Sequence, residues 1–455
     1  YSYWNNLEIY ARNIGKQVKV WWSEGFATGE ADTLGMGYNA IGKIDAFHEE
    51  TRDDKGTRRY DRSNILYDSK AMMMSFHESG YNEKNQAYSY DRWNITYRQD
   101  GQVWGYQEKG VRAGYDSDVT YSLTRKNMDY DGDDIVSFYE EGISEQEKEY
   151  AYYRSDIDYN QSGQMVAYTE AGSLEGEQYE FRRSAIKYDG EDRMDSFHEE
   201  GYDSKGVNYK FDRKFNGYTG QNALGYSETG FRGMTEAHPE GKSYNLVKSE
   251  MEYDSRDRLI YFREEGTDTA GDVYSYTRKM GDENGNNAYD RRGNILQFFE
   301  KGERQRRGKG VFKDYSMKRD MMKYAGGMLI GYHEAGIGAD DEEYELVKEN
   351  MMYYGDSMIS YDEYGEREGD WYELSRTGIT YEGDNTTGYS EEGIDTMGNS
   401  YSYTRSEMTY DWYLGNQIGY KEVGIKEGGE YTLIRSDMRY HEDTDLLKSY
   451  QDIKS

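Results

Sequence analysis

Residues 401–424 read YSYTRSEMTYDWYLGNQIGYKEVG, and this stretch decides the fold because the chain repeats it. The same pattern returns as YSLTRKNMDYDGDDIVSFYEEG at residues 121–142 and as YAYYRSDIDYNQSGQMVAYTEAG at residues 150–172. The shared unit is Tyr-x-Tyr-x-Arg-x-x-(Ile/Met)-x-Tyr-(Asp/Asn), a polar turn, and (Ile/Met)-x-x-Tyr-x-Glu-x-Gly. A fixed internal period predicts a repeat architecture, in which each unit buries its apolar residues against its neighbours.

The period of the array can be measured at the Glu-x-Gly end of the unit. Its glycines are about 30 residues apart, with longer spacings in the middle of the chain. They are Gly80, Gly110, Gly142, Gly172, Gly201, Gly230, Gly266, Gly302, Gly336, Gly365, Gly393 and Gly424. Degenerate copies at residues 47–51 and 450–454 flank this run. We therefore predict a single repeat array over residues 1–455, with about fifteen copies and no separate globular domain.

The composition indicates a thin structure made of extended strands. Hydrophobic residues make up 35% of the 455 residues, below the roughly 45–50% of ordinary globular chains, and 51 residues are Tyr. This argues against a thick aliphatic core. One proline, Pro239, and 52 glycines suit long hydrogen-bonded strands joined by many turns, because proline removes a ladder donor and glycine serves in turns.

Charge and motif content exclude several classes of function. The net charge of −32 argues against binding to nucleic acid and to anionic membranes. No apolar run approaches the roughly 18 residues of a spanning helix, and the absence of cysteine excludes disulfides and thiolate metal sites. No phosphate-binding loop, paired-histidine metal motif or nucleophile elbow occurs. We therefore expect no enzyme, no cofactor and no metal site.

Each repeat contains two runs with the character of β-strands. Residues 401–410 and 418–425 are rich in Tyr, Thr and apolar residues, and residues bounding them are Gly, Asp and Asn. The linkers are short, as at residues 131–134 and 395–399, so neighbouring strands should be antiparallel. We predict an all-β fold, a tandem-repeat strip of antiparallel β-hairpins. Long open sheets curl, so the strip should coil into a tube, spiral or solenoid.

The first strand of the repeat leaves two arrangements open. Tyr401, Tyr403 and Arg405 share one parity, whereas Met408 and Tyr410 share the other. Either the strand presents these two sets on opposite faces, or a β-bulge resets the register and brings them to one face.

The charged residues of the motif form two columns that we expect to pair. If Tyr159 lies opposite Met165, Arg154 faces Glu170 across the hairpin, and the same offset places Arg405 opposite Glu422. Stacked repeats would align such pairs into a ladder that sets strand register, while each exposed pair would add only about 0–1 kcal/mol. A catalytic carboxylate would not be copied in every repeat; a ligand site is the alternative. The predicted ladder includes Arg125, Glu140, Arg154, Glu170, Arg183, Glu199, Arg405 and Glu422.

Other motif residues also have a structural and a functional interpretation. The Tyr columns are interpreted as cross-strand packing, with stacking on sugar rings as the alternative. The acidic turn at residues 129–134 is interpreted as a solvated turn, because it departs from the EF-hand pattern at the glycine position. His48, His77, His198 and His333 occupy one slot before Glu, which indicates a tolerated side-chain position and not a metal cluster.

The segment Tyr-Asp-x-x-Gly-x-(Ile/Leu/Met) resembles the YD repeats of the RHS family. The best matches are at residues 159–165, 253–259 and 289–295. The resemblance implies long β-strips that spiral into a hollow shell, often around a toxin, or that serve in large bacterial surface proteins. The period here is longer than that of the usual YD unit, and the Glu and Arg columns mark a variant type.

These observations favour a structural protein over a protein with one active site. We expect a repeat array that builds an extracellular bacterial fibre, tube or stalk at the cell surface. Its expected partners are itself or further repeats of the same chain, with glycans as a further possibility, and neither nucleic acid nor a membrane span. An RHS-type shell that encloses a toxin and a glycan-binding adhesin are the alternatives.

Overall fold

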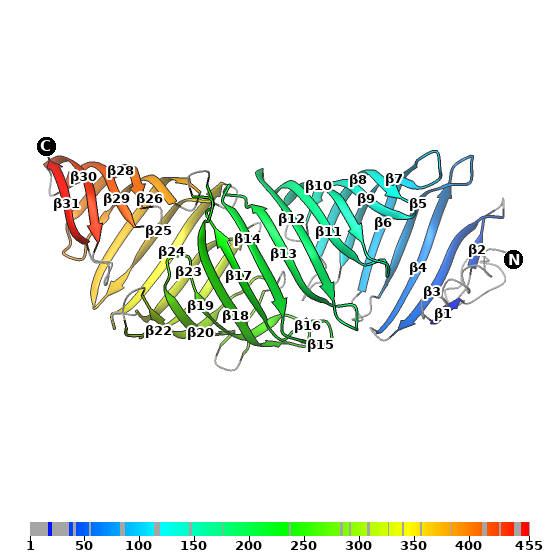
Figure 1. Ribbon diagram of the computed structural model, residues 1–455, viewed down its shortest axis with the longest axis horizontal. Coiled ribbons are helices and arrows are strands. Elements are labelled where there is room, and N and C mark those ends of the chain that lie inside the picture. Colours follow the sequence, from blue (N-terminus) through cyan, green and yellow to red (C-terminus); the bar gives the residue numbers. More distant parts are fainter. Residues whose placement is uncertain are drawn as a thin grey trace. The chain divides into compact units, whose positions relative to one another are not determined.

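The computed structural model contains strands and their connections and no helix among the residues that it describes (Figure 1). This confirms the predicted all-β class. The chain divides into two compact units, Tyr1–Ser155 and Asp156–Ser455. The structure describes residues 17–20, 36–39, 42–53, 56–81, 87–112, 119–144, 148–174, 176–235, 238–282, 285–290, 293–306, 310–325, 327–338, 341–354, 357–383, 385–411, 416–426, 429–440 and 447–454.

The first unit is an antiparallel sheet in which consecutive strands pair from β3 onward, and β1 and β2 both pair with β3. The last of its strands, β10, continues past the division between the units. The strands are β1 Gln17–Val20, β2 Met36–Tyr38, β3 Ile44–Asp53, β4 Gly56–Tyr67, β5 Met73–Tyr81, β6 Ala87–Tyr97, β7 Val103–Arg112, β8 Val119–Asp131, β9 Asp134–Ile143 and β10 Glu149–Tyr159.

The second unit continues the same hairpin pattern. Its strands pair antiparallel with their neighbours in the chain, except that β15 and β16 form a separate two-stranded sheet and β14 pairs with β17. The strands are β11 Met165–Leu174, β12 Glu177–Tyr188, β13 Met194–Tyr202, β14 Asn208–Phe215, β15 Tyr218–Thr219, β16 Asn222–Ala223, β17 Tyr226–Arg232, β18 Lys242–Tyr253, β19 Leu259–Thr267, β20 Val273–Met280, β21 Phe298–Gln305, β22 Lys313–Ala325, β23 Met328–Ile337, β24 Glu343–Tyr354, β25 Ser357–Arg367, β26 Asp370–Glu382, β27 Asn385–Ile394, β28 Ser400–Tyr410, β29 Gln417–Lys426, β30 Gly429–Tyr440 and β31 Leu447–Lys454.

Each regular repeat therefore supplies two adjacent strands to one sheet, as the hairpin-strip prediction requires. Five-residue turns join several of the strand pairs; in the turn after β12, Asp189 N donates to Arg193 O at 2.8 Å. Both units are built from this repeat. The number of copies over the whole of residues 1–455 stays a prediction.

Within the second unit the sheet coils back on itself. Gly383 lies in the turn after β26, and Val207 lies in the turn before β14, far away in the sequence. A Cβ atom on Gly383 would lie 3.2 Å from Cγ2 of Val207. The turn at Gly383 connects the two strands of one hairpin, whereas the turn at Val207 connects one hairpin to the next. These two kinds of turn lie at opposite edges of the strip, so the opposite edges meet in this unit.

A β-bulge decides between the two arrangements left open for the first strand. In the β28–β29 pair the register shifts between Ser406 and Thr409, and Glu407 between them has a φ of 54°. The same left-handed backbone recurs two residues after the basic residue, at Asn64, Asn94, Asn127, Asp156, Ala185, Glu250, Met321, Asn350, Gly378, Glu407 and Asp437. The extra residue turns the strand over, so all motif residues lie on one face. After Ala185, for example, Ile186 is buried and Lys187 is exposed.

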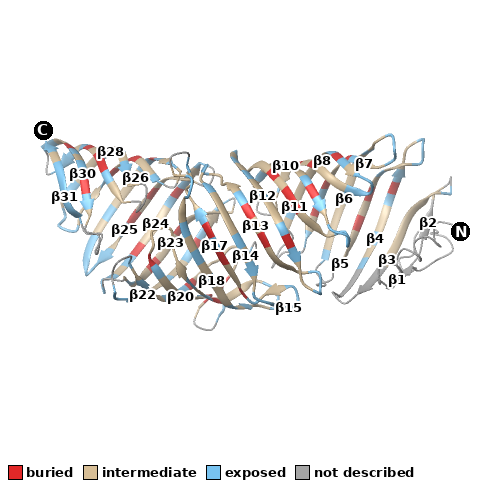
Figure 2. Cartoon of the chain, in the orientation of Figure 1, coloured by how far each residue is buried: buried red, intermediate tan, exposed pale blue. Residues whose placement is uncertain are grey.

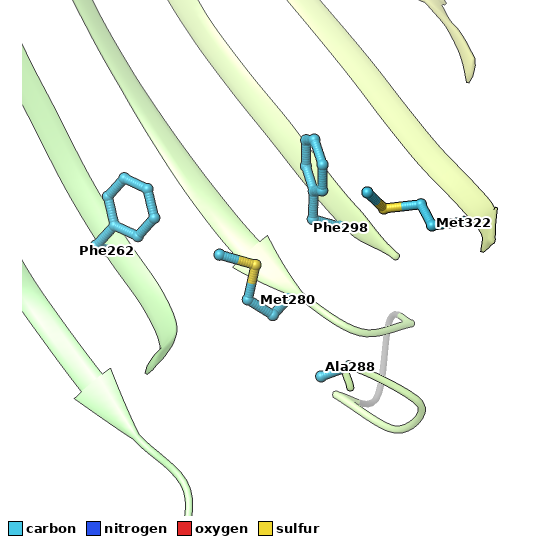
Figure 3. Packing of buried hydrophobic residues seen from close by; sticks show 5 residues of the cluster. All are labelled: Phe262, Met280, Ala288, Phe298 and Met322. Carbon is cyan, nitrogen blue, oxygen red and sulfur yellow. The ribbon is translucent and has the colours of Figure 1, made fainter. Parts of the chain in front are cut away.

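The core is a narrow band that follows this motif face. Buried residues form short stretches on successive strands in both units (Figure 2). In one cluster Phe262, Met280, Phe298 and Met322 come from four consecutive strands, and Ala288 comes from the connection between β20 and β21 (Figure 3). Each apolar side chain thus packs against residues of the neighbouring strands, as expected for a repeat array.

Candidate functional site

The second strand of the repeat carries a carboxylate that is buried. Glu78 has no exposed surface, and ten of its counterparts are at most 9% exposed. The expectation that the charged pairs lie exposed is therefore wrong, because the side chains of the motif cover one another on the sheet face. The buried members are Glu78, Glu108, Glu140, Glu170, Glu199, Glu228, Glu300, Glu334, Glu363, Glu391 and Glu422.

An arginine on the preceding strand binds one oxygen of this carboxylate. Arg125 Nε lies 2.7 Å from Glu140 Oε2, and the two residues are direct cross-strand partners. The same arrangement joins Arg183 to Glu199 with an Nε–Oε2 distance of 2.8 Å. In the last of the predicted pairs, Arg405 Nε lies 2.9 Å from Glu422 Oε2.

The remaining predicted pair, Arg154 and Glu170, has one member in each unit, and it stays a prediction. Arg154 lies over the ring of Tyr152 at 5.4 Å and over that of Phe138 at 5.7 Å. Glu170 accepts a hydrogen bond from the Tyr179 hydroxyl at 3.0 Å. Lysine replaces arginine in two other repeats, where Lys248 Nζ lies 2.9 Å from Glu264 and Lys348 Nζ lies 2.8 Å from Glu363.

A tyrosine on the following strand binds the other carboxylate oxygen, which the sequence reasoning missed. This is the first Tyr of Tyr-x-Tyr-x-Arg, as in the bond from the Tyr209 hydroxyl to Glu199 Oε1 at 3.1 Å. The donor–acceptor pairs are Tyr88–Glu78, Tyr121–Glu108, Tyr150–Glu140, Tyr179–Glu170, Tyr209–Glu199, Tyr244–Glu228, Tyr274–Glu264, Tyr315–Glu300, Tyr344–Glu334, Tyr372–Glu363, Tyr401–Glu391 and Tyr431–Glu422. Where the carboxylate also binds an arginine or lysine on the preceding strand, as Glu199 does, it joins three adjacent strands.

The glycine two residues after Glu makes room for this tyrosine. Tyr209 lies directly opposite Gly201 in the β13–β14 pair. A Cβ atom on Gly201 would lie 2.1 Å from Glu180 O on the other neighbouring strand. On Gly110 it would meet the ring of Tyr121 at 2.5 Å. The fixed spacing of Tyr before Arg and of Gly after Glu was the signal in the sequence for this contact.

The guanidinium groups also lie between aromatic rings. The Arg183 Cζ atom is 4.4 Å from the centre of the Phe197 ring, and Arg213 Cζ lies 5.6 Å from the same ring. Phe197 packs edge-on against Phe211 at 5.8 Å. Rings and cations therefore alternate along the motif face, and each cation–π contact is worth about 0.5–1 kcal/mol or more where desolvated.

Burial and the neighbouring carboxylates keep the motif tyrosines protonated. Burial, followed by the charge of Glu363, raises the pKa of Tyr372 to about 12. Burial, followed by the charge of Glu391, raises the pKa of Tyr401 above its ordinary value. Burial, followed by the hydrogen bond to Glu422, raises the pKa of Tyr431 in the same way. These hydroxyls are therefore hydrogen-bond donors at neutral pH and not bases.

The Tyr-Asp dipeptide at the end of the first strand has two structural roles. The Tyr188 hydroxyl donates to the backbone oxygen of Met165 at 2.7 Å, which ties each repeat to the preceding one. The next residue, Asp189, accepts hydrogen bonds from the backbone nitrogens of Glu191 and Arg193 at 2.9 and 3.0 Å, which caps the turn. Corresponding tyrosine bonds are made by Tyr67, Tyr97, Tyr130, Tyr218, Tyr253, Tyr289, Tyr324, Tyr381, Tyr410 and Tyr440.

The opposite face carries the four histidines of the shared slot. His48, His77 and His198 each bind an aspartate on the next strand, with Nδ1–Oδ1 distances of 2.9, 2.9 and 3.0 Å. His333 binds Asp320 at 2.7 Å and Glu345 at 2.9 Å. In the described part of the chain, no group of three His, Asp or Glu residues could hold a metal ion.

The arrangement on the motif face provides cohesion between repeats. Its arginines, glutamates and tyrosines bind one another across consecutive strands, and the same contacts recur along each unit. Among the described residues, no helix has the length and apolar character that a membrane crossing requires.

Comparisons with known proteins found similar solved structures but no matching family. No protein-family model matches the chain, and the search of curated proteins found no match. Among solved structures, a Tc holotoxin pore from Photorhabdus luminescens is similar over 87% of this chain, with 10% sequence identity and a TM-score of 0.21. The match covers 20% of that chain, so this protein spans about a fifth of its length. A TM-score this low carries no argument about function.

Proposed function

We propose that this chain is a structural repeat protein that builds a fibre, tube or stalk outside a bacterial cell. One observation carries the proposal: the motif of each repeat is completed by side chains of the repeats on both sides. Glu391, for example, binds Arg376 of its own repeat and Tyr401 and Tyr403 of the following repeat. On the other side, Tyr372 of the same repeat binds Glu363 of the preceding repeat. Such contacts stabilise an array of any length and need no ligand.

The two faces of the sheet support the same proposal. The motif face repeats its residues closely, whereas the opposite face varies from repeat to repeat. The repeated contacts between side chains explain the first pattern, and on the second face the histidines of the shared slot occur in only four of the repeats. The Tyr-Asp bonds between repeats also give a physical reason for the resemblance to YD repeats, and we propose membership of the RHS type on that ground.

An RHS-type shell around a toxin is the second candidate. The meeting of opposite strip edges near Val207 and Gly383 favours it, because a coil whose edges touch can wall off a space. This candidate requires cargo, whereas a fibre or stalk does not.

Electron microscopy of the purified chain tests both candidates. Structural arrays should appear as rods or filaments, with a length that grows when repeats are added and with an empty interior. Density for a folded cargo inside a shell would favour the second candidate. Compact particles whose size does not change with repeat number would contradict both.

A further inference from the structure

The face opposite the buried carboxylates is hollowed into a groove over strands β26 to β30. The groove has a volume of 760 Å³, and a neighbouring hollow of 480 Å³ over β25 to β28 shares three of its lining residues. These are Ser375, Glu392 and Ser402. A hollow lined by consecutive strands of one sheet means that the sheet curves around this face.

Two rows of cross-strand neighbours line the groove. One row is Thr377, Ser390, Thr404, Val423 and Thr432, and the next row begins with Ser375, Glu392 and Ser402. Apart from Glu392, the side chains named in these rows are short, so the groove stays open. Ser390 Oγ and Thr404 Oγ1 lie 2.9 Å apart, and one of the two hydroxyls donates to the other.

Elsewhere in this unit, longer side chains occupy the positions equivalent to the first row. In strands β12 to β14 the equivalent residues are Ser184, His198 and Asp212. His198 Nδ1 lies 3.0 Å from Asp212 Oδ1, and this longer pair covers the surface that Ser390 and Thr404 leave open. The groove is therefore a local departure from a pattern that the chain uses in several repeats.

The chemistry of the lining selects one class of ligand. Serine and threonine hydroxyls donate and accept hydrogen bonds, and the exposed carboxylates of Glu392 and Glu430 accept them. Val423 and Ile425, both 46% exposed, add apolar surface beside these groups. Neither lysine nor arginine lines this groove among the described residues, which disfavours anionic ligands.

We propose that this groove binds a neutral oligosaccharide whose chain runs across the strands. Sugar hydroxyls would bind the serine, threonine and glutamate oxygens, and the C–H faces of the rings would cover Val423 and Ile425. The proposal goes beyond the structural role, because it concerns the opposite face of the sheet and one stretch of strands. The array could therefore lose this site and still assemble.

Calorimetric titration of the purified chain tests the proposal. The probes are neutral hexasaccharides of glucose and of N-acetylglucosamine, a sulfated oligosaccharide and hexalysine. One variant, Ser390→His with Thr404→Asp, installs the pair that fills this row in other repeats. The matched control, His198→Ser with Asp212→Thr, removes such a pair outside the groove. Thermal unfolding of both variants verifies that they are folded.

A neutral hexasaccharide should bind the unmodified chain with saturation at millimolar concentration. The groove-filling variant should weaken this binding at least about tenfold, which corresponds to roughly 1.4 kcal/mol, and the control should leave it within about twofold. The proposal is overturned if no neutral sugar saturates the chain, or if both variants bind equally well. Binding of hexalysine alone would assign the groove to a basic peptide, and binding of the sulfated sugar alone would refute the charge argument.

Discussion

At the scale of single residues, the buried glutamate governs the energetics of the repeat. An ionised carboxylate loses several kcal/mol of hydration on burial, and it is tolerated only when hydrogen bonds and an opposite charge replace the water. The two oxygens of Glu391 meet this demand with groups from different strands, Arg376 on one side and Tyr401 and Tyr403 on the other. The removal of one partner therefore affects three strands.

Replacement of Glu391 should show this dependence. We expect Glu391→Ala to destabilise the array by about 3 kcal/mol, because it leaves Arg376 partly buried without a counter-charge. The adjacent Glu392 is exposed on the opposite face, so Glu392→Ala should change stability by less than about 0.5 kcal/mol. Urea unfolding followed by circular dichroism measures both variants, and equal effects would contradict the buried-pair account.

The motif tyrosines should make the array sensitive to alkali. The pKa of Tyr372 is raised to about 12 in the folded chain, whereas tyrosine in an unfolded chain titrates near 10. The unfolded state therefore releases its proton at lower pH, so this stabilisation is complete below about pH 10 and is lost as the pH rises toward 12. The melting temperature should fall steeply above pH 10, with phenolate absorbance appearing together with unfolding. Tyrosines that ionise well before unfolding would refute this prediction.

At the scale of the elements, the hairpin depends on a β-bulge in its first strand and on the close approach of neighbouring strands at the glycine of its second strand. The bulge brings Tyr, Arg, Ile or Met, and the second Tyr to one face, so that a single face carries the whole motif. Where β13 passes between its neighbours, Gly201 lies against the backbone of β12 and beneath Tyr209 of β14. A side chain there would separate the three strands that share Glu199.

Substitution of this glycine tests the close approach. A Cβ atom on Gly201 would lie 2.1 Å from Glu180 O, so Gly201→Ala should destabilise the array by about 2–3 kcal/mol through displaced backbone. Gly190 is the control, because a Cβ atom there meets nothing within 4 Å and its φ is not positive. Gly190→Ala should be neutral in thermal unfolding. A neutral Gly201→Ala would show that the strands separate easily.

At the scale of the whole molecule, each of the two units is a sheet with a thin band of core. Its accessible surface is 27179 Å², whereas a compact monomer of 53.2 kDa exposes roughly 18,000 Å². A large exposed surface is expected where the core of each unit is a narrow band in which side chains of the motif face cover each other. Stability must therefore come from contacts between successive repeats.

Stability should accordingly depend on the number of repeats. Nearest-neighbour contacts add one interface with each unit, so chains shortened by whole repeats from the carboxyl end should melt at progressively lower temperatures. Fragments of two or three repeats should be largely unfolded. Differential scanning calorimetry of the series measures this, and a melting temperature independent of length would point instead to a separate, dominant core.

Local patterns in the sequence were enough to predict the strands, the turns, the hairpin strip and the opposition of Arg405 to Glu422. They suffice because alternation, turn residues and hairpin register act within a few residues of each other. The choice of the bulge at Glu407, the burial of Glu391, the hydrogen bond from Tyr401, and the groove around Ser390 depended on the tertiary structure. Each of these follows from how several strands approach one another, and a sheet with the same strand pattern could expose its carboxylates and remain flat.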